Sequence, residues 1–295
     1  MQFNRNLITG LAICTAIIFS SCHKKETVEV DNETQSVIDN AVAEQEFFAT
    51  VPAMHGVAIK TKGTGADKNR PLGTEAADCD SLKLISGDTL FGQMNHVPPT
   101  YEFDYTNATC TPLPDAKIRE GKIQMTLYGR VKEVGSRIKF VMIGYKAANS
   151  DPNKKIDYIC DSIVVKTVAN DPVTKIREFN IKIYNGKCVG AGGSWTTLYT
   201  ADRNVRLNMD NNMVQIWGSS NGTNRQGRTF TVDVPAASPL TKWPSCQFIS
   251  SGILKLTPQG FKTRTVDYSS GTGQDNCDDD ATFEVNGNTV AFKLK

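Results

Sequence analysis

Six cysteines are spaced so that their thiols can pair as disulfides. They fall into three successive pairs, and the pairs span 31, 28 and 31 positions. Each interval holds two strand-like segments joined by a turn, and the ends of such segments meet at a hairpin mouth. Disulfides need Cα atoms about 4.4–6.8 Å apart, which a hairpin mouth offers. The predicted disulfides are Cys79–Cys110, Cys160–Cys188 and Cys246–Cys277.

Acidic residues beside the last cysteine form the clearest candidate for metal binding. Asp275 and residues 278–280 flank Cys277, and several carboxylates together can hold calcium. Their order does not match an EF-hand loop, because neither the turn glycine nor the closing glutamate is present. A solvated strand entry is the favoured interpretation. We predict no metal site and no cofactor.

Three tryptophans are candidates for ligand binding. Trp195, Trp217 and Trp243 lie in or beside strand-like segments, and an aromatic face exposed on a β surface can stack on a sugar ring. Buried core aromatics are the commoner explanation for such residues. Both interpretations remain open from the sequence.

Local motifs for catalysis are missing. No G-x-S-x-G elbow or phosphate-binding loop occurs, and neither His55 nor His96 has an evident nucleophile beside it. A glycosidase needs only two carboxylates, which counting cannot exclude. The sequence leans away from an enzyme and leaves a glycan hydrolase with paired carboxylates as the alternative.

The first segment has the layout of an export signal. An apolar run from Leu7 to Phe19 follows Arg5 and ends in Ser20 and Ser21. At 13 residues it is shorter than the roughly 20 that a membrane span requires. We therefore predict a signal peptide over residues 1–21.

The end of this signal resembles the lipobox of bacterial lipoproteins, in the residues Phe19-Ser20-Ser21-Cys22. The phenylalanine and the charges after Cys22 are similar to lipoproteins of the Bacteroidota. The resemblance implies that Cys22 is lipidated and that the chain is cut before it. It further implies a lipid anchor in the outer membrane, with periplasmic and surface orientations both open. A plain signal peptide with a nearby cysteine is the alternative.

The remaining chain divides into a short first part and a long β region. Residues 22–33 are predicted to form a flexible tether, and residues 34–78 a helix and a loop. The helix covers residues 34–51 by its apolar spacing and is expected to end before Pro52. Residues 79–295 form an all-β region with three weak repeats, at 79–159, 160–245 and 246–295.

Alternating polar and apolar residues predict the strands of this β region. Asn286-Gly287 between the last two alternating runs is a strong hairpin signal. The expected fold is mainly β: antiparallel sandwich or barrel-like sheets built from disulfide-closed hairpin units, with one amphipathic helix near the N-terminus. Residues 246–295 also resemble the C-terminal part of a group of uncharacterised β-rich Bacteroidota lipoproteins. That resemblance implies no activity.

Charge limits the choice of partner. Without residues 1–21, the chain carries 32 basic and 31 acidic side chains and has no long basic run. Nucleic acid is therefore not an expected partner. The favoured hypothesis is a non-catalytic cell-envelope lipoprotein that binds a ligand or protein or has a structural role.

Overall fold

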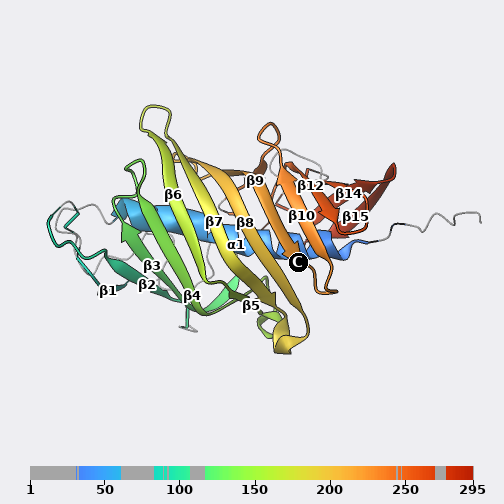
Figure 1. Ribbon diagram of the computed structural model, residues 1–295, viewed down its shortest axis with the longest axis horizontal. Coiled ribbons are helices and arrows are strands. Elements are labelled where there is room, and N and C mark those ends of the chain that lie inside the picture. The colour runs from blue at the N-terminus through green and yellow to red at the C-terminus, as the bar shows by residue number, and fades with distance from the viewer. Residues whose placement is uncertain are drawn as a thin grey trace, which may run out of the picture. The chain divides into compact units, whose positions relative to one another are not determined.

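The alternating segments join into one antiparallel sheet in the computed structural model (Figure 1). The structure describes residues 31–294 except 32, 61–82, 89, 92, 107–116, 244, 247 and 270–276, and in α1 the side chains as far as residue 48. The predicted mainly β fold is confirmed, and the 15 strands formed by the described residues belong to a single continuous sheet.

Neighbouring strands of the sheet follow one another in the chain, with two exceptions. Strand β6 pairs with β4 and β7, beside β5, and β11 pairs with β9. The elements are α1 (Gln35–Lys60), β1 (Lys83–Ser86), β2 (Thr100–Asp104), β3 (Ile118–Tyr128), β4 (Arg137–Ala148), β5 (Ile156–Ile159), β6 (Ser162–Asp171), β7 (Ile176–Val189), β8 (Thr196–Asn208), β9 (Val214–Thr223), β10 (Thr229–Val234), β11 (Leu240–Lys242), β12 (Ile253–Pro258), β13 (Arg264–Asp267), β14 (Asp280–Val285) and β15 (Asn288–Lys293), with short 3-10 helices at Pro152–Lys154 and Ala191–Gly193.

Period-two alternation gives the sheet an inner and an outer face. On β8 the side chains of Val205 and Leu207 are buried on the inner face, whereas those of Asp202 and Arg206 are exposed on the outer face. Successive side chains of a strand point to opposite faces, so the apolar residues of all long strands meet in one core.

All three cysteine intervals contain an antiparallel strand pair, as predicted: β1 with β2, β6 with β7, and β12 with β13. The disulfide Cys246–Cys277 is present, with a Cα–Cα distance of 5.2 Å. The hairpin between β14 and β15 turns at Asn286 and Gly287, whose φ angles are 55° and 75°. Cys79 and Cys110 lie outside the described residues.

The predicted Cys160–Cys188 disulfide is wrong in this structure, where both residues are buried free thiols. Cys188 on β7 lies directly opposite Tyr158 on β5. Cys160 comes two residues after Tyr158, so the two cysteines are diagonal neighbours. Diagonal positions in an antiparallel pair are about 7–8 Å apart, which is beyond the usual reach of a disulfide.

Helix α1 lies along the inner face of the sheet, where it contacts β7, β8, β9 and β12 (Figure 1). Its predicted start is confirmed, but it continues through Pro52 to Lys60. The Phe47 ring stacks on that of Tyr199 at 5.8 Å and meets that of Tyr158 edge-on at 5.7 Å. Within the described residues, no helix has the length and hydropathy that a membrane span requires.

Acidic residues of α1 are buried against basic residues of the strands, which the sequence did not predict. Glu46 pairs with Lys117 and Arg119, each at 3.0 Å, and accepts a hydrogen bond from Tyr145. Burial alone raises the pKa of Glu46, but the charges of Arg119 and Lys117 outweigh burial and hold that pKa at about 2.

Two further ion pairs fix the helix along the same face. Glu44 pairs with Arg203, and Asp39 pairs with Arg225. Because an unpaired buried charge is costly, these pairs set the position of the helix along the sheet.

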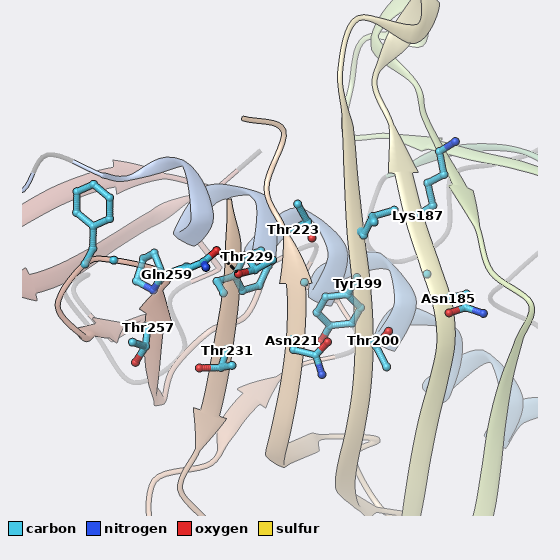
Figure 2. Close-up of a pocket in the computed structure, with 17 residues that line it drawn as sticks. Asn185, Lys187, Tyr199, Thr200, Asn221, Thr223, Thr229, Thr231, Thr257 and Gln259 are labelled. Atoms are coloured by element: carbon cyan, nitrogen blue, oxygen red, sulfur yellow. Dashed lines mark hydrogen bonds between the residues drawn. The ribbon is translucent and has the colours of Figure 1, made fainter. Parts of the chain in front are cut away.

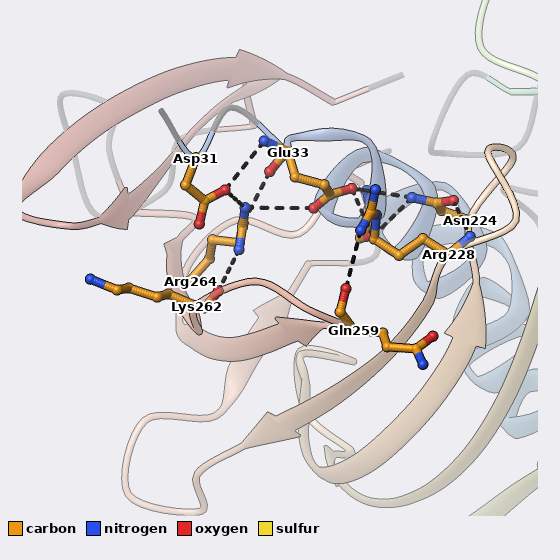
Figure 3. A network of polar contacts seen from close by, with 8 residues as sticks. Asp31, Glu33, Asn224, Arg228, Gln259, Lys262 and Arg264 are labelled. Carbon is orange, nitrogen blue, oxygen red and sulfur yellow. Dashed lines mark hydrogen bonds and ion pairs between the residues drawn. The ribbon is translucent and has the colours of Figure 1, made fainter. Parts of the chain in front are cut away.

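The start of the helix is fixed by Arg264, whose side chain is fully buried (Figure 3). Its guanidinium donates to the Asp31 carboxylate and, at 3.0 Å, to the Glu33 carbonyl. The Glu33 carboxylate accepts hydrogen bonds from the Ser36 backbone at 2.9 Å and from Asn224 at 3.1 Å. The predicted tether over 22–33 is therefore too long at its end, since Asp31 and Glu33 already belong to the fold.

Candidate functional site

A hollow of about 660 Å³ lies on the outer face where β7, β8, β9, β10 and β12 run side by side (Figure 2). Its volume falls within the range of about 300–1,000 Å³ that is typical of small-molecule sites. The lining residues are Asn185, Gly186, Lys187, Leu198, Tyr199, Thr200, Asn221, Gly222, Thr223, Thr229, Phe230, Thr231, Thr257, Pro258, Gln259, Gly260 and Phe261.

Two glycines and a bulge shape the sheet at this point. The pairing of β7 with β8 shifts between Ile183 and Gly186, where Asn185 has a φ of 49°. A Cβ atom on Gly222 would lie 2.3 Å from the Leu198 carbonyl oxygen and 2.6 Å from the Phe230 ring. Only glycine allows this close approach of strand and ring. The bulge increases the local twist of the sheet.

One rank of polar side chains crosses the hollow in register. Thr200 lies opposite Asn221, Asn221 opposite Thr231, and Thr231 opposite Thr257. Figure 2 shows these four side chains in a row. Adjacent strands are about 4.8 Å apart, so the rank repeats a hydrogen-bonding group at that interval.

A second rank runs parallel to the first, two residues further along each strand. Its members are Lys187, Leu198, Thr223, Thr229 and Gln259. Two residues of a strand span about 6.6–6.8 Å, and five strands span about 19 Å. We call the hollow between the two ranks the outer trough.

Internal hydrogen bonds hold one end of the outer trough in place. The Thr229 hydroxyl donates to the Gln259 side chain at 2.9 Å, and the Arg228 guanidinium donates to the Gln259 carbonyl at 3.1 Å. The same guanidinium lies 4.2 Å from the centre of the Phe261 ring. These contacts restrict the side chains at this end before any ligand arrives.

The outer trough is nearly uncharged. Among its described lining residues, Lys187 carries the one charge, and no carboxylate is present. The other side chains with polar ends are hydroxyls and amides, which both donate and accept hydrogen bonds. This lining suits a polar, uncharged ligand and lacks the acid pair that glycoside hydrolysis needs.

One pair of carboxylates elsewhere on the outer face shares a cation. Glu102 and Asp104 share Lys122, at 2.8 and 3.3 Å. Hydrogen bonds from Gln124 and Lys122 lower the pKa of Glu102, and those from Thr106 lower the pKa of Asp104. A glycosidase general acid needs a raised pKa, so this pair does not have the required property.

The three predicted tryptophans are not brought together. Trp195 precedes β8 and lies under Arg225, 4.0 Å from the ring centre. Trp217 on β9 lies opposite Asn204 of β8, which comes nine residues after Trp195. Nine residues of extended strand span roughly 30 Å, so Trp195 and Trp217 lie far apart. Trp243 follows β11 and, like the other two, is half-buried against the core. They do not form one stacking platform.

The acidic cluster near Cys277 is balanced by a lysine. Asp279 and Asp280 both pair with Lys293, at 2.6 and 2.8 Å. Asp275 lies outside the described residues. In the part of the chain that the structure describes, no group of three His, Cys, Asp or Glu side chains could hold a metal ion.

His96 belongs to an Asp–His pair that the sequence did not indicate. Its Nδ1 lies 2.6 Å from Asp88, whose carboxylate also accepts the backbone N–H groups of Leu90 and Val97. Hydrogen bonds from Val97 and His96 lower the pKa of Asp88 to about 2. The carboxylate thus holds together the connection between β1 and β2.

The outer trough itself was missed at the sequence level. Its residues are ordinary outward positions of separate strands, and only the register of five strands places them side by side. The two threonines at alternate positions of β10, Thr229 and Thr231, were the available signal. Cys22, the predicted lipid-attachment site, lies outside the described residues.

No protein-family model matches the chain, and neither a curated protein nor a solved structure is significantly similar to it.

Proposed function

We propose that this protein is a cell-envelope lipoprotein that binds a polar ligand in the outer trough and leaves it chemically unchanged. The observation that carries the proposal is the lining: two in-register ranks made mostly of hydroxyl and amide side chains, with Leu198 and Lys187 as the exceptions and no carboxylate among the described lining residues. Such a surface can form many hydrogen bonds but offers no acid pair and no nucleophile with its base.

The sequence supports a location in the cell envelope. The short apolar run before Cys22 and the small residues at positions 20 and 21 favour export and lipidation. Two or more acyl chains hold a protein stably on a membrane. Only positions 23–30 separate Cys22 from Asp31, where the described fold begins, so the lipid would tether the fold to the membrane through at most about 30 Å of extended chain.

Binding without conversion can be tested with the full mature protein. The protein is dialysed against polysaccharide, glycolipid and lipid fractions of envelopes from the producing bacterium, and retained material is compared by mass spectrometry before and after contact. Asn221→Arg places a long charged side chain in the first rank. Ser219→Arg on the same strand and face, outside the trough lining, is the matched control.

We expect the wild type and Ser219→Arg to retain the same compound unchanged, and Asn221→Arg to lose it with the melting temperature preserved. Equal retention by all three proteins would reject the outer trough as the site. Release of a shortened glycan would reject the non-catalytic role.

A further inference from the structure

We infer that the ligand of the outer trough is a linear, uncharged oligosaccharide that lies across the strands. This inference rests on the proposed function and specifies its ligand class. It starts from the chemistry of the first rank, in which Thr200, Asn221 and Thr231 lie side by side in register. Hydroxyl and amide groups both donate and accept, as sugar hydroxyls do, so either partner can take either role.

The repeat along the rank favours a polymer over a single compact ligand. Neighbouring strands place equivalent groups about 4.8 Å apart, which is close to the length of one pyranose unit in an extended chain. The two ranks enclose a trough that crosses five strands, a distance of about 19 Å. A chain of several sugar rings can therefore repeat one contact from strand to strand.

Apolar surface in the trough fits the C–H faces of sugar rings. Leu198 is 49% exposed although it stands in the second rank between polar neighbours. The half-buried Phe261 ring lines the end of the trough near β12. The Arg228 guanidinium already lies over that ring, 4.2 Å from its centre, so the exposed Leu198 is the apolar surface that a sugar ring would meet first. Polar side chains with the apolar surface of Leu198 among them match the two kinds of surface on a saccharide.

The charge and pairing of the strands make anionic polymers and peptides poorer ligands for the outer trough than an uncharged oligosaccharide. Lys187 lies at one end, and the Arg228 guanidinium at the other end already contacts Gln259 and Phe261, so the described lining has no row of cations that would track a row of phosphates or carboxylates. The strands under the trough are paired on both sides, so an extended peptide cannot add to them as a further strand. An uncharged chain needs neither feature.

The experiment is a titration of the isotope-labelled full mature protein, followed by NMR and calorimetry. The probes are neutral gluco-, manno- and xylo-oligosaccharides from one to six units, with an oligogalacturonate and a threonine-rich peptide for comparison. Thr231→Arg blocks the first rank, and Thr231→Val removes its hydroxyl while keeping its shape. Thr265→Arg, on the outer face of β13 outside the trough lining, is the control.

We expect at least one neutral series to bind with an affinity that rises with chain length, and to shift amide signals of β8, β9, β10 and β12. Thr231→Arg should weaken binding roughly tenfold or more, Thr231→Val by a smaller factor, and Thr265→Arg should have no effect. The inference fails if no neutral oligosaccharide binds, if affinity is independent of length, or if the charged or peptide probe binds better. Retention of an envelope compound that depends on Asn221, without saccharide binding, would reject the ligand class and leave the proposed function standing.

Discussion

Arg203 on β8 and Glu44 on α1 form an ion pair from which water is excluded, since their side chains are 0% and 2% exposed. The same guanidinium donates to the Gly218 carbonyl and, at 3.0 Å, to the Ser220 hydroxyl. Tyr199 donates to the Glu44 carboxylate at 3.1 Å. Helix and sheet are thus joined through a network in which each charge depends on its partner.

Breaking this pair should destabilise the fold strongly. Arg203→Met leaves the Glu44 carboxylate buried without its cation, and we expect the free energy of unfolding to fall by about 3–5 kcal/mol. The double variant Arg203→Met/Glu44→Met buries no unpaired charge and should be more stable than either single variant. Urea denaturation measures all three.

The exposed pair of Arg206 with Glu178 provides the control. Arg206→Met should cost less than about 1 kcal/mol, because a solvated ion pair contributes little. A double variant whose loss equals the sum of the single losses would contradict the coupling of Arg203 and Glu44.

Acid should weaken the protein partly through Glu46. The folded-state pKa of Glu46 is about 2 against an ordinary value of 4.5, because Arg119, Lys117 and the Tyr145 hydrogen bond together outweigh burial. A lowered pKa stabilises the fold above the unfolded-state value, and the contribution of roughly 3 kcal/mol is lost as the pH falls from about 4.5 to about 2.

Comparison with Glu46→Gln isolates this contribution. The difference in unfolding free energy between wild type and variant should be constant above pH 5 and shrink towards pH 2, as urea titrations at stepped pH would show. A difference that does not change with pH would mean that Glu46 has no lowered pKa.

The Cys246–Cys277 disulfide closes a loop with a sequence separation of 31. In the chain-entropy account, a loop of this length stabilises the folded state by roughly 3–4 kcal/mol. Cys246→Ala/Cys277→Ala should therefore lower the melting temperature in calorimetry. An unchanged melting temperature, with the wild-type bridge verified by peptide mapping, would refute the prediction.

Cys160 and Cys188 should be inert thiols in the native protein. Burial raises the pKa of Cys160 to about 12 and that of Cys188 still further, so few thiolates form near neutral pH. We expect iodoacetamide to label both residues only after unfolding, as read by mass spectrometry of their peptides. Rapid labelling of the folded protein, or a peptide that links the two, would show a different arrangement.

Lipidation at Cys22 is open to a direct test. Cells that express the wild type should incorporate a radioactive fatty acid into the protein, and cells that express Cys22→Ser should not. The small residues before Cys22 and the short apolar run motivate the expectation. Equal incorporation into both proteins would exclude lipidation at this residue.

Local patterns of the sequence were enough to predict the strands and several turns. Alternation along β7 and β8 and the Asn286-Gly287 turn depend on neighbouring residues alone. The burial of Glu44 and Glu46 was not predictable, because their partners lie 71 to 159 positions away. The outer trough was missed for the same reason: nothing in β8 or β10 specifies their register against β9. The pairing of Cys160 with Cys188 was inferred from spacing alone. Spacing does not reveal that the two cysteines are offset by two residues across β5 and β7, where both remain free thiols.

The placement of α1 has a consequence for how the chain matures. The acids of the helix are synthesised first, whereas the cations that neutralise them follow much later; Arg264 comes 233 positions after Asp31. A chain that lacks Arg264 cannot bury Asp31 and Glu33 without a large penalty, although the partners of Glu46, Glu44 and Asp39 come earlier in the sequence. Contacts between such distant positions also form slowly. The full network around the start of α1 can therefore form only after residue 264 has been synthesised.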